Sequence, residues 1–486
     1  MTENREGKAA SSIFFKLGES VGRELIVFVV NIVLARLLDP ADHGVLTMLT
    51  VFISLAQVFV QSGLNTALVQ KKEADETDCS SVFYAGLLIA VGCYGLLFFA
   101  APAIAAYFEM PELTATLRVL ALILIPGAFV MVEDAVVARR MLFRKSMLAG
   151  LLATLFSGVV GVGMAWAGMK HWALVGQQLT NTLLQAVLLM VLTKWHPKWL
   201  FSWQKLKGLL SFGWRILVSS LLDTGYNQLR TAVIGKKYAT DTLGSYNKGR
   251  QFPELVMSAV NTSVQSVMLP VLSQQQENRE RMREILRRSL MTACFLVFPL
   301  MAGLSAVATP LVTLLLTEKW LPCVPFLQIC CIDYAFYPVH TFNLQAVNAM
   351  GRSDLFLKLE LVKKSYGILL LVGAVFLCHS VEAIVWSGVI STCLSLVVNA
   401  WPNGKLLGYG FSKQWRDLLP ILLSSVIMFV AVLALGQLNL PTLPLLCVQV
   451  AAGVGIYGGL SILFRVPALK LVKEMLPGLL KKGGKQ

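Results

Sequence analysis

The sequence predicts an all-α, polytopic membrane protein, and two observations support this fold class. Of the 486 residues, 56% are hydrophobic and only 14% are charged, and the mean hydropathy is +0.68. Apolar stretches of about 18 to 25 residues, enough to cross a bilayer core as helices, recur from one end of the chain to the other. Together these observations exclude a soluble domain of ordinary size.

The apolar stretches number fourteen, and each is predicted to form one transmembrane helix. They lie near residues 17–36, 44–66, 81–104, 115–137, 148–168, 171–193, 210–234, 244–271, 286–308, 322–348, 357–378, 381–400, 418–437 and 441–463. The first six belong to a predicted N-terminal lobe, residues 1–193, and the next six to a C-terminal lobe, residues 209–400. Residues 401–464 add two further helices, so the predicted architecture is two six-helix bundles plus a C-terminal pair.

The segments between and after the bundles have the composition of chain at a membrane surface. Residues 194–208 join the two lobes, and their tryptophans alternate with Lys and His, as expected at the level of the lipid headgroups. Residues 465–486 form a basic tail with regularly spaced leucines beside lysines. We therefore predict a cytoplasmic interfacial linker and a basic cytoplasmic tail.

Internal repeats indicate that the two lobes are equivalent. The segment LARLLDPADHG at 34–44 is answered by IGKKYATDTLG at 234–244, and APAIAAYFEMPEL from Ala101 resembles ATPLVTLLLTEKW from Ala308. Six spans, an even number, separate equivalent helices, so the halves run in the same direction. The predicted symmetry is a pseudo-two-fold axis along the membrane normal.

The distribution of Lys and Arg predicts the orientation of the chain. With the N-terminus placed in the cytoplasm, roughly 28 basic residues fall in inner loops and about 5 in outer loops, the bias expected of a membrane protein. Both termini are therefore predicted to be cytoplasmic. The formal net charge of +15 then reflects topology and contact with anionic membrane lipids, not binding of nucleic acid.

Two predicted helices carry a polar stripe through the hydrocarbon. On the first helix the stripe contains Glu19, Arg23, Glu24 and Asn31, and on the seventh it contains Arg215, Asp223, Tyr226 and Arg230. A charged side chain at the middle of a bilayer helix costs about 2.5 to 3.5 kcal/mol, so such stripes are expected to face protein or a water-filled cavity. Ion pairs that only join two helices remain the alternative interpretation.

No pattern in the sequence indicates catalysis or a cofactor. The nine cysteines lack metal-ligand spacing, the five histidines are scattered, and HExxH, GxSxG and P-loop motifs are absent. We therefore expect no catalytic residues, no bound metal and no cofactor, and we expect that the protein is not an enzyme.

Three stretches resemble one known family. They are LARLLDPADHGVLTMLTVFISLAQVFVQSGLNTALVQKKE from Leu34, the APAIAAYF segment and RRMLFRKSM from Arg139. The chain is similar to the polysaccharide transporter branch of the multidrug/oligosaccharidyl-lipid/polysaccharide exporter superfamily, and within it to lipopolysaccharide and teichuronic-acid-type flippases. The resemblance implies a two-lobed fold in a bacterial inner or plasma membrane. It also implies alternating access that moves a polyprenyl-diphosphate-linked oligosaccharide for cell-surface polysaccharide biosynthesis, with other polysaccharide-assembly proteins as further candidate partners.

That cargo suggests roles for the polar residues. A diphosphate needs fixed cations, and the candidates are Arg23, Arg215, Arg230, Lys248 and Arg250. Sugar hydroxyls need neutral partners, for which Asn31 and Tyr226 are candidates, and the acids Glu19, Glu24, Asp223 and Asp333 are candidates for binding a coupling proton or Na⁺.

Two other function classes stay open at this point. An ion-coupled multidrug or metabolite antiporter of the same fold is the main alternative, although cationic drugs would favour uncompensated carboxylates and aromatic faces. A membrane enzyme of envelope glycan synthesis is weaker, because the outer loops are short.

Overall fold

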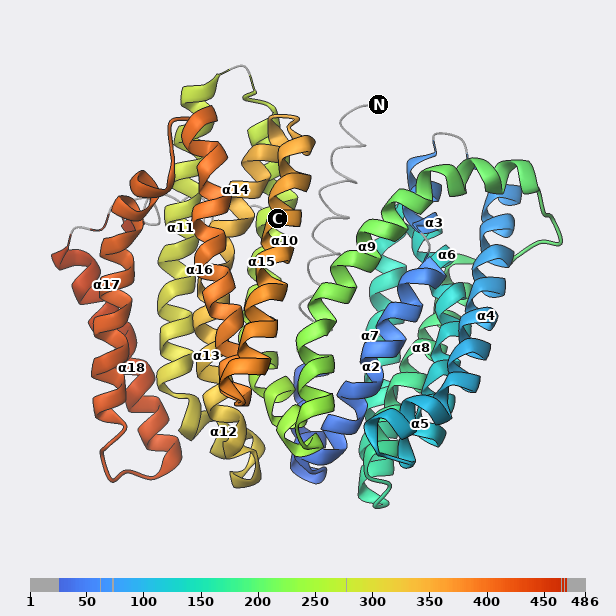
Figure 1. Cartoon of the computed structure of the whole chain (residues 1–486), viewed down its shortest axis with the longest axis horizontal. Coiled ribbons are helices and arrows are strands. Elements are labelled where there is room, and N and C mark those ends of the chain that lie inside the picture. The colour runs from blue at the N-terminus through green and yellow to red at the C-terminus, as the bar shows by residue number, and fades with distance from the viewer. Residues whose placement is uncertain are drawn as a thin grey trace. The chain divides into compact units, whose positions relative to one another are not determined.

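The structure is a computed structural model that describes residues 26–61, 63–71, 74–276, 278–464, 466, 468 and 469. These residues are almost entirely helical and contain no strand, which confirms the all-α prediction (Figure 1). Eleven helices within them are long and apolar enough to cross a membrane, and a shorter apolar helix covers Ile26–Leu37. Three of the fourteen predicted spans are not among the eleven: the first lies partly outside the described residues, and the helices at the seventh and eighth carry more polar residues.

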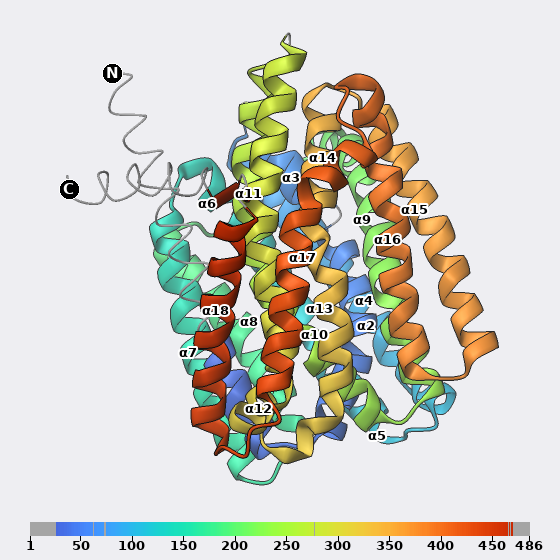
Figure 2. The same ribbon diagram turned by 90° about the vertical axis from the view of Figure 1, so that its left-hand side faces the viewer.

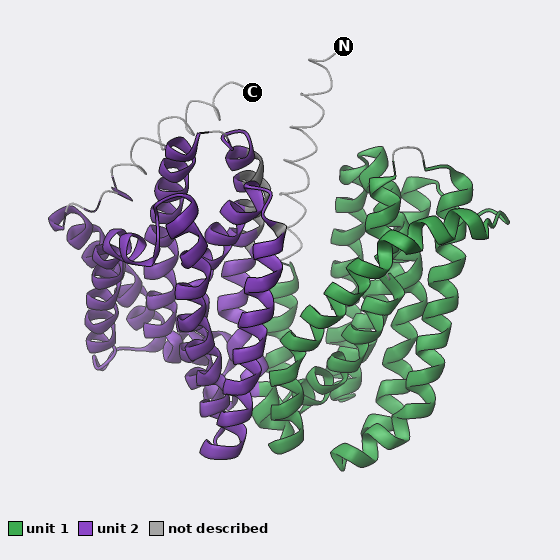
Figure 3. Ribbon diagram, turned by 45° about the horizontal axis from the view of Figure 1, so that its top comes forward, with its two compact units in different colours: residues 1–244 green, residues 245–486 purple. Residues whose placement is uncertain are grey.

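The chain divides into two compact units, Met1–Gly244 and Ser245–Gln486 (Figure 3). The numbered helices of unit 1 are α2 (Pro40–Gln61), α3 (Leu64–Gln70), α4 (Glu76–Phe108), α5 (Glu112–Leu120), the 3₁₀ turn η1 (Ala121–Ile123), α6 (Leu124–Arg140), α7 (Phe143–Trp166), α8 (His171–Thr193) and α9 (Trp203–Lys237). By its contacts α9 belongs with α2, α3 and α4 in unit 1, whereas the sequence repeat groups it with the C-terminal lobe. The pseudo-two-fold axis stays a prediction.

Unit 2 begins within α10 (Thr240–Ser273), whose first five residues belong to unit 1. It continues with α11 (Arg279–Ala306), α12 (Ala308–Leu316), η2 (Glu318–Cys323), α13 (Val324–Ala335), α14 (Tyr337–Ala349), α15 (Ser353–Gly373), the π-helical turn η3 (Ala374–Cys378), α16 (Val381–Leu406), α17 (Phe411–Leu435) and α18 (Thr442–Leu463).

Small residues allow close packing in unit 1, where α7 lies along α8. Ala149, Ala153, Ser157 and Gly161 recur every fourth residue on the buried face of α7. Because this spacing keeps one face of a helix small, the helix backbones approach closely, and Asn181 of α8 donates a hydrogen bond to the Ser157 hydroxyl at 3.1 Å. Packing of this kind suits hydrocarbon, where burial of apolar side chains alone gives little driving force between helices.

In unit 2 the two C-terminal helices, α17 and α18, lie side by side (Figure 2). They are held by packing and by a buried amide network. The Gln414 side chain of α17 both donates to and accepts from Asn343 of α14, at 2.8 and 2.9 Å, and Asn403 of α16 donates to the same Asn343 oxygen at 2.7 Å. Tyr457 of α18 donates to the main-chain oxygen of Phe295 at 2.8 Å. The C-terminal pair is therefore an integral part of unit 2.

The two copies of the first sequence repeat meet inside unit 1. A Cβ atom at Gly44 of α2 would lie 1.8 Å from the main-chain oxygen of Thr240, and one at Gly244 would lie 1.9 Å from the main-chain oxygen of Pro40. Real Cβ atoms do not come so close, so both positions require glycine in this arrangement. The repeats LARLLDPADHG and IGKKYATDTLG thus end in equivalent glycines that form a reciprocal backbone crossing.

Candidate functional site

The predicted stripe on the first helix is only partly within the described residues. Glu19, Arg23 and Glu24 precede residue 26 and lie outside them. Asn31, on the helix Ile26–Leu37, is half-buried. The proposal that the first helix supplies a cation therefore stays a prediction.

The second predicted stripe lies along α9 in unit 1. Arg215 and Asp223 are exposed, Tyr226 and Arg230 are half-buried, and the four recur on one side of the helix. The side-chain amide of Asn227 donates to the Asp223 carboxylate at 3.3 Å. The stripe is thus a row of exposed and half-buried polar groups, two of them cationic.

The polarity of α9 sets it apart from the apolar helices around it. With 35 residues it is about 52 Å long, well beyond the thickness of a bilayer core, but it is not among the eleven apolar spans. A helix of this length and polarity needs protein or water beside its charged side. This side of α9 is the candidate site of unit 1.

Unit 2 has a candidate group of its own, where Arg250 of α10 meets Tyr334 of α13. The guanidinium of Arg250 donates from Nε to the Tyr334 hydroxyl at 3.3 Å and pairs with the Glu254 carboxylate at 3.2 Å. Tyr334 stacks on Tyr337, with ring centroids 6.2 Å apart. Arg250 is only half-buried, so its fork of donors is positioned by two partners while part of it stays accessible.

The other two candidates in unit 2 lie in different surroundings. Lys248 is 4% exposed, and its ammonium lies 5.5 Å from the centroid of the fully buried Trp320 ring. Asp333 is half-buried and accepts a hydrogen bond from the Thr392 hydroxyl. Among the described residues Arg250 forms its ion pair with Glu254 and not with Asp333, so the cation and the predicted ion-coupling acid belong to separate groups.

Sequence reasoning missed the partners that position Arg250. Glu254 could have been found, because it follows Arg250 by four residues and an i, i+4 pair shares one side of a helix. Tyr334 comes from a helix more than eighty residues away, and only tertiary packing places it there. A buried acid on α6, Glu133, was also missed, although it interrupts a largely apolar stretch.

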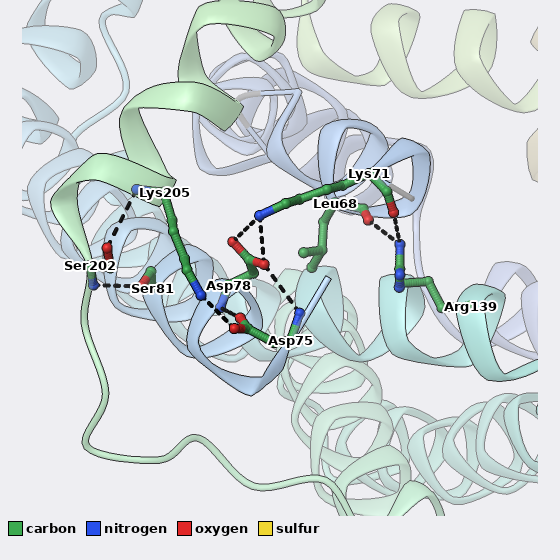
Figure 4. A network of polar contacts seen from close by, with 8 residues as sticks. All are labelled: Leu68, Lys71, Asp75, Asp78, Ser81, Arg139, Ser202 and Lys205. Atoms are coloured by element: carbon green, nitrogen blue, oxygen red, sulfur yellow. Dashed lines mark hydrogen bonds and ion pairs between the residues drawn. The ribbon is translucent and has the colours of Figure 1, made fainter. Parts of the chain in front are cut away.

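A polar network in unit 1 holds the start of α4 against the chain that leads into α9 (Figure 4). Lys71 donates to the carboxylate of Asp78 at 2.7 Å, Lys205 pairs with Asp75, and the Ser202 main-chain N–H donates to the Ser81 hydroxyl at 2.9 Å. The ammonium of Lys205 lowers the pKa of the Asp75 carboxyl to about 2.

The connecting segment before α9 is also docked on α4. Trp195 is 2% exposed, and its indole N–H donates to Glu76 at 3.2 Å. Trp199, by contrast, is 96% exposed. One tryptophan of the predicted interfacial linker therefore packs inside unit 1, while another is free to meet a membrane surface.

Comparison with known proteins agrees with this architecture. Residues 33–325 match the family described as "Polysaccharide biosynthesis protein". The chain is 27% identical over 317 residues to the succinoglycan biosynthesis transport protein ExoT of Rhizobium meliloti (strain 1021), a match that covers 65% of this chain and 64% of ExoT. It is 24% identical to the teichuronic acid biosynthesis protein TuaB of Bacillus subtilis (strain 168), covering 82% of this chain and 83% of TuaB.

Among solved structures, the chain shares its fold with the lipid II flippase MurJ in an inward closed conformation. The TM-score is 0.77 at 15% sequence identity, and the match covers 93% of this chain and 99% of MurJ.

Proposed function

This chain belongs to the polysaccharide biosynthesis protein family, and we propose that it moves a lipid-linked oligosaccharide across a bacterial inner or plasma membrane by alternating access. The observation that carries this proposal is α9, a membrane-length helix that keeps Arg215 and Arg230 among apolar helices. Hydrocarbon does not tolerate such a helix, but a passage for a charged and hydroxyl-rich headgroup requires one. Both termini are cytoplasmic in this proposal.

The chemistry of the candidate groups fits a diphosphate. A planar guanidinium presents donors in a fork that matches phosphate oxygens, and Arg250 is held ready by Tyr334 and Glu254. Hydroxyl and amide groups of unit 1, such as those of Tyr226 and Asn31, are suited to sugar hydroxyls. The protein acts here as a transporter without catalysis, and other polysaccharide-assembly proteins are its proposed partners.

The antiporter alternative is not favoured. The family and the named relatives concern polysaccharide biosynthesis, and the candidate groups on α9 and α10 include more cations than acids: Arg215, Arg230, Lys248 and Arg250 against Asp223 and Glu254. A cationic drug would find repulsion there, whereas an anionic headgroup is attracted.

The test is movement of a fluorescent polyprenyl-diphosphate oligosaccharide across proteoliposome membranes. We expect Arg250→Ala and Arg215→Ala to lower the rate at least tenfold, and Arg250→Lys to lie between them and wild type because it keeps the charge and loses the fork. Arg283→Ala, an exposed arginine on α11, is the matched control and keeps the wild-type rate. Absence of movement by the wild-type protein would refute the proposed cargo, and full rates for both alanine variants would remove these arginines from its path.

A further inference from the structure

One buried acid in unit 1 lacks the partners that a buried carboxylate requires. Glu133 of α6 is 1% exposed and lies seven residues before Arg140, the last residue of its helix. Its Oε2 accepts a hydrogen bond from the Thr193 hydroxyl at 2.7 Å. Its Oε1 is buried and has no hydrogen-bond partner among the described residues.

Asp78 of α4 provides an internal comparison, because it is also 1% exposed. Both of its carboxylate oxygens accept from the Lys71 ammonium at 2.7 Å, and one also accepts from the main-chain N–H of Asp75 at 3.1 Å. These are the two buried acids in the described part of the chain, and only Asp78 has a cation within ion-pair distance there.

The charges near Glu133 do not neutralise it. Its own helix carries Arg140, whose ion pair at 3.4 Å is with Glu76, and the exposed Asp134, which adds negative charge. Among the described residues of the helices packed on α6, the polar contact to Glu133 is the neutral Thr193 hydroxyl at the end of α8. An ionised carboxylate in this place would leave a buried charge without a counter-ion, which is costly.

We propose that Glu133 is a proton-binding site of unit 1. The proton binds to Oε1 and turns the carboxylate into a neutral carboxylic acid, while Oε2 continues to accept from Thr193. On release the proton passes to water and the carboxylate forms again. A proton is the ligand that fits, because a single carboxylate and one hydroxyl do not supply the six or more oxygens of a typical hard-cation site.

The site is connected to the chain that leads from α8 into α9. The Thr193 hydroxyl that donates to Glu133 also accepts from the main-chain N–H of Trp195 at 3.2 Å, and the Trp195 indole donates to Glu76. Binding of a proton at Glu133 therefore weakens the hydrogen bond from Thr193, because a neutral carboxylic acid is a weaker acceptor than a carboxylate, and this change reaches the segment before α9. Coupling of this proton to transport rests on the proposed function, whereas binding of the proton does not.

Infrared spectroscopy of the purified protein tests the binding directly. At neutral pH we expect the C=O band of a neutral carboxylic acid in wild type and in the matched control Asp134→Asn, and its loss in Glu133→Gln. Thr193→Val should shift the band, because the hydrogen bond to Oε2 is removed. An identical spectrum for wild type and a folded Glu133→Gln variant, or a band that Thr193→Val leaves in place, would overturn the assignment.

The coupling is tested in proteoliposomes with and without a pH gradient. We expect a pH gradient to speed movement of the lipid-linked oligosaccharide by wild type and by Asp134→Asn. In Glu133→Gln, which keeps an oxygen that accepts from Thr193, the increase in rate caused by the gradient should be at least tenfold smaller than in wild type. Equal stimulation in Glu133→Gln would overturn the coupling. Failure of wild type to move the lipid would count against the proposed function and leave the infrared result standing.

Discussion

The glycine crossing in unit 1 gives a prediction whose size follows from the structure. A Gly44→Ala methyl would lie 1.8 Å from the Thr240 oxygen, and real Cβ contacts essentially never fall below 3.0 Å, so the two backbones must separate by about 1.2 Å. Overpacking of this kind costs about 1 to 3 kcal/mol. A clash this short with a backbone atom belongs at the upper end of that range, and alanine in place of glycine inside a helix returns up to about 1 kcal/mol, so we expect a net destabilisation of about 2 kcal/mol.

Gly244→Ala should behave in the same way, because its methyl would lie 1.9 Å from the Pro40 oxygen. A separation that admits one methyl group also admits the other, so the double variant is expected to cost less than the sum of the single variants. This less-than-additive result is the signature of one shared crossing.

The measurement is unfolding of the detergent-solubilised protein, with Gly92→Ala and Gly95→Ala on α4 as controls. Neither control meets an atom within 4 Å of its new Cβ, so both should match or exceed wild-type stability. Equal stability of Gly44→Ala and Gly92→Ala, or strict additivity of the two crossing variants, would refute the reasoning.

Three further predictions concern polar contacts. Lys71→Met leaves the buried Asp78 carboxylate without its cation and should lower the free energy of unfolding by about 3 kcal/mol. Lys71→Arg keeps a cation there and should retain most of the wild-type stability. A loss below about 1 kcal/mol in Lys71→Met would contradict this. Lys205 lowers the pKa of Asp75 to about 2, so the stabilisation from this pair is present above pH 4 and disappears as the pH falls toward 2. The free energies of unfolding of wild type and Asp75→Asn should therefore differ above pH 4 and become equal near pH 2. Asn343→Leu leaves a buried amide oxygen of its partner without a donor and should cost about 1 to 3 kcal/mol in chemical unfolding; wild-type stability would show that the network contributes nothing.

Much of the candidate site was accessible from residue pattern. The polar side of α9 was predicted because Arg215, Asp223, Tyr226 and Arg230 share one side at helical spacing, and this depends only on local geometry. The partners of Arg250 were not predicted as a set. Tyr334 reaches it from another helix, and single-sequence patterns do not say which helices become neighbours.

The sequence by itself determined the class of the protein, because continuous apolar stretches of about 18 to 25 residues cross hydrocarbon as helices, which satisfy their backbone hydrogen bonds internally. All fourteen predicted stretches overlap helices within the described residues. The seventh and eighth stretches, which were counted as apolar spans, form α9 and α10, and neither is among the eleven apolar helices.

Only the tertiary structure decided which buried polar residues obtain a hydrogen-bond or ion-pair partner. Asp78 lies in the first turn of α4 and Glu133 lies inside α6, and these positions alone do not say which carboxylate obtains a cation. Asp78 obtains an ammonium from Lys71, because a short loop returns the chain to it, whereas Glu133 obtains one hydroxyl from Thr193. The physical reason is that the burial and pairing of a side chain depend on which helices meet after folding. Composition and the 3.6-residue helical period describe only the helix that carries the side chain.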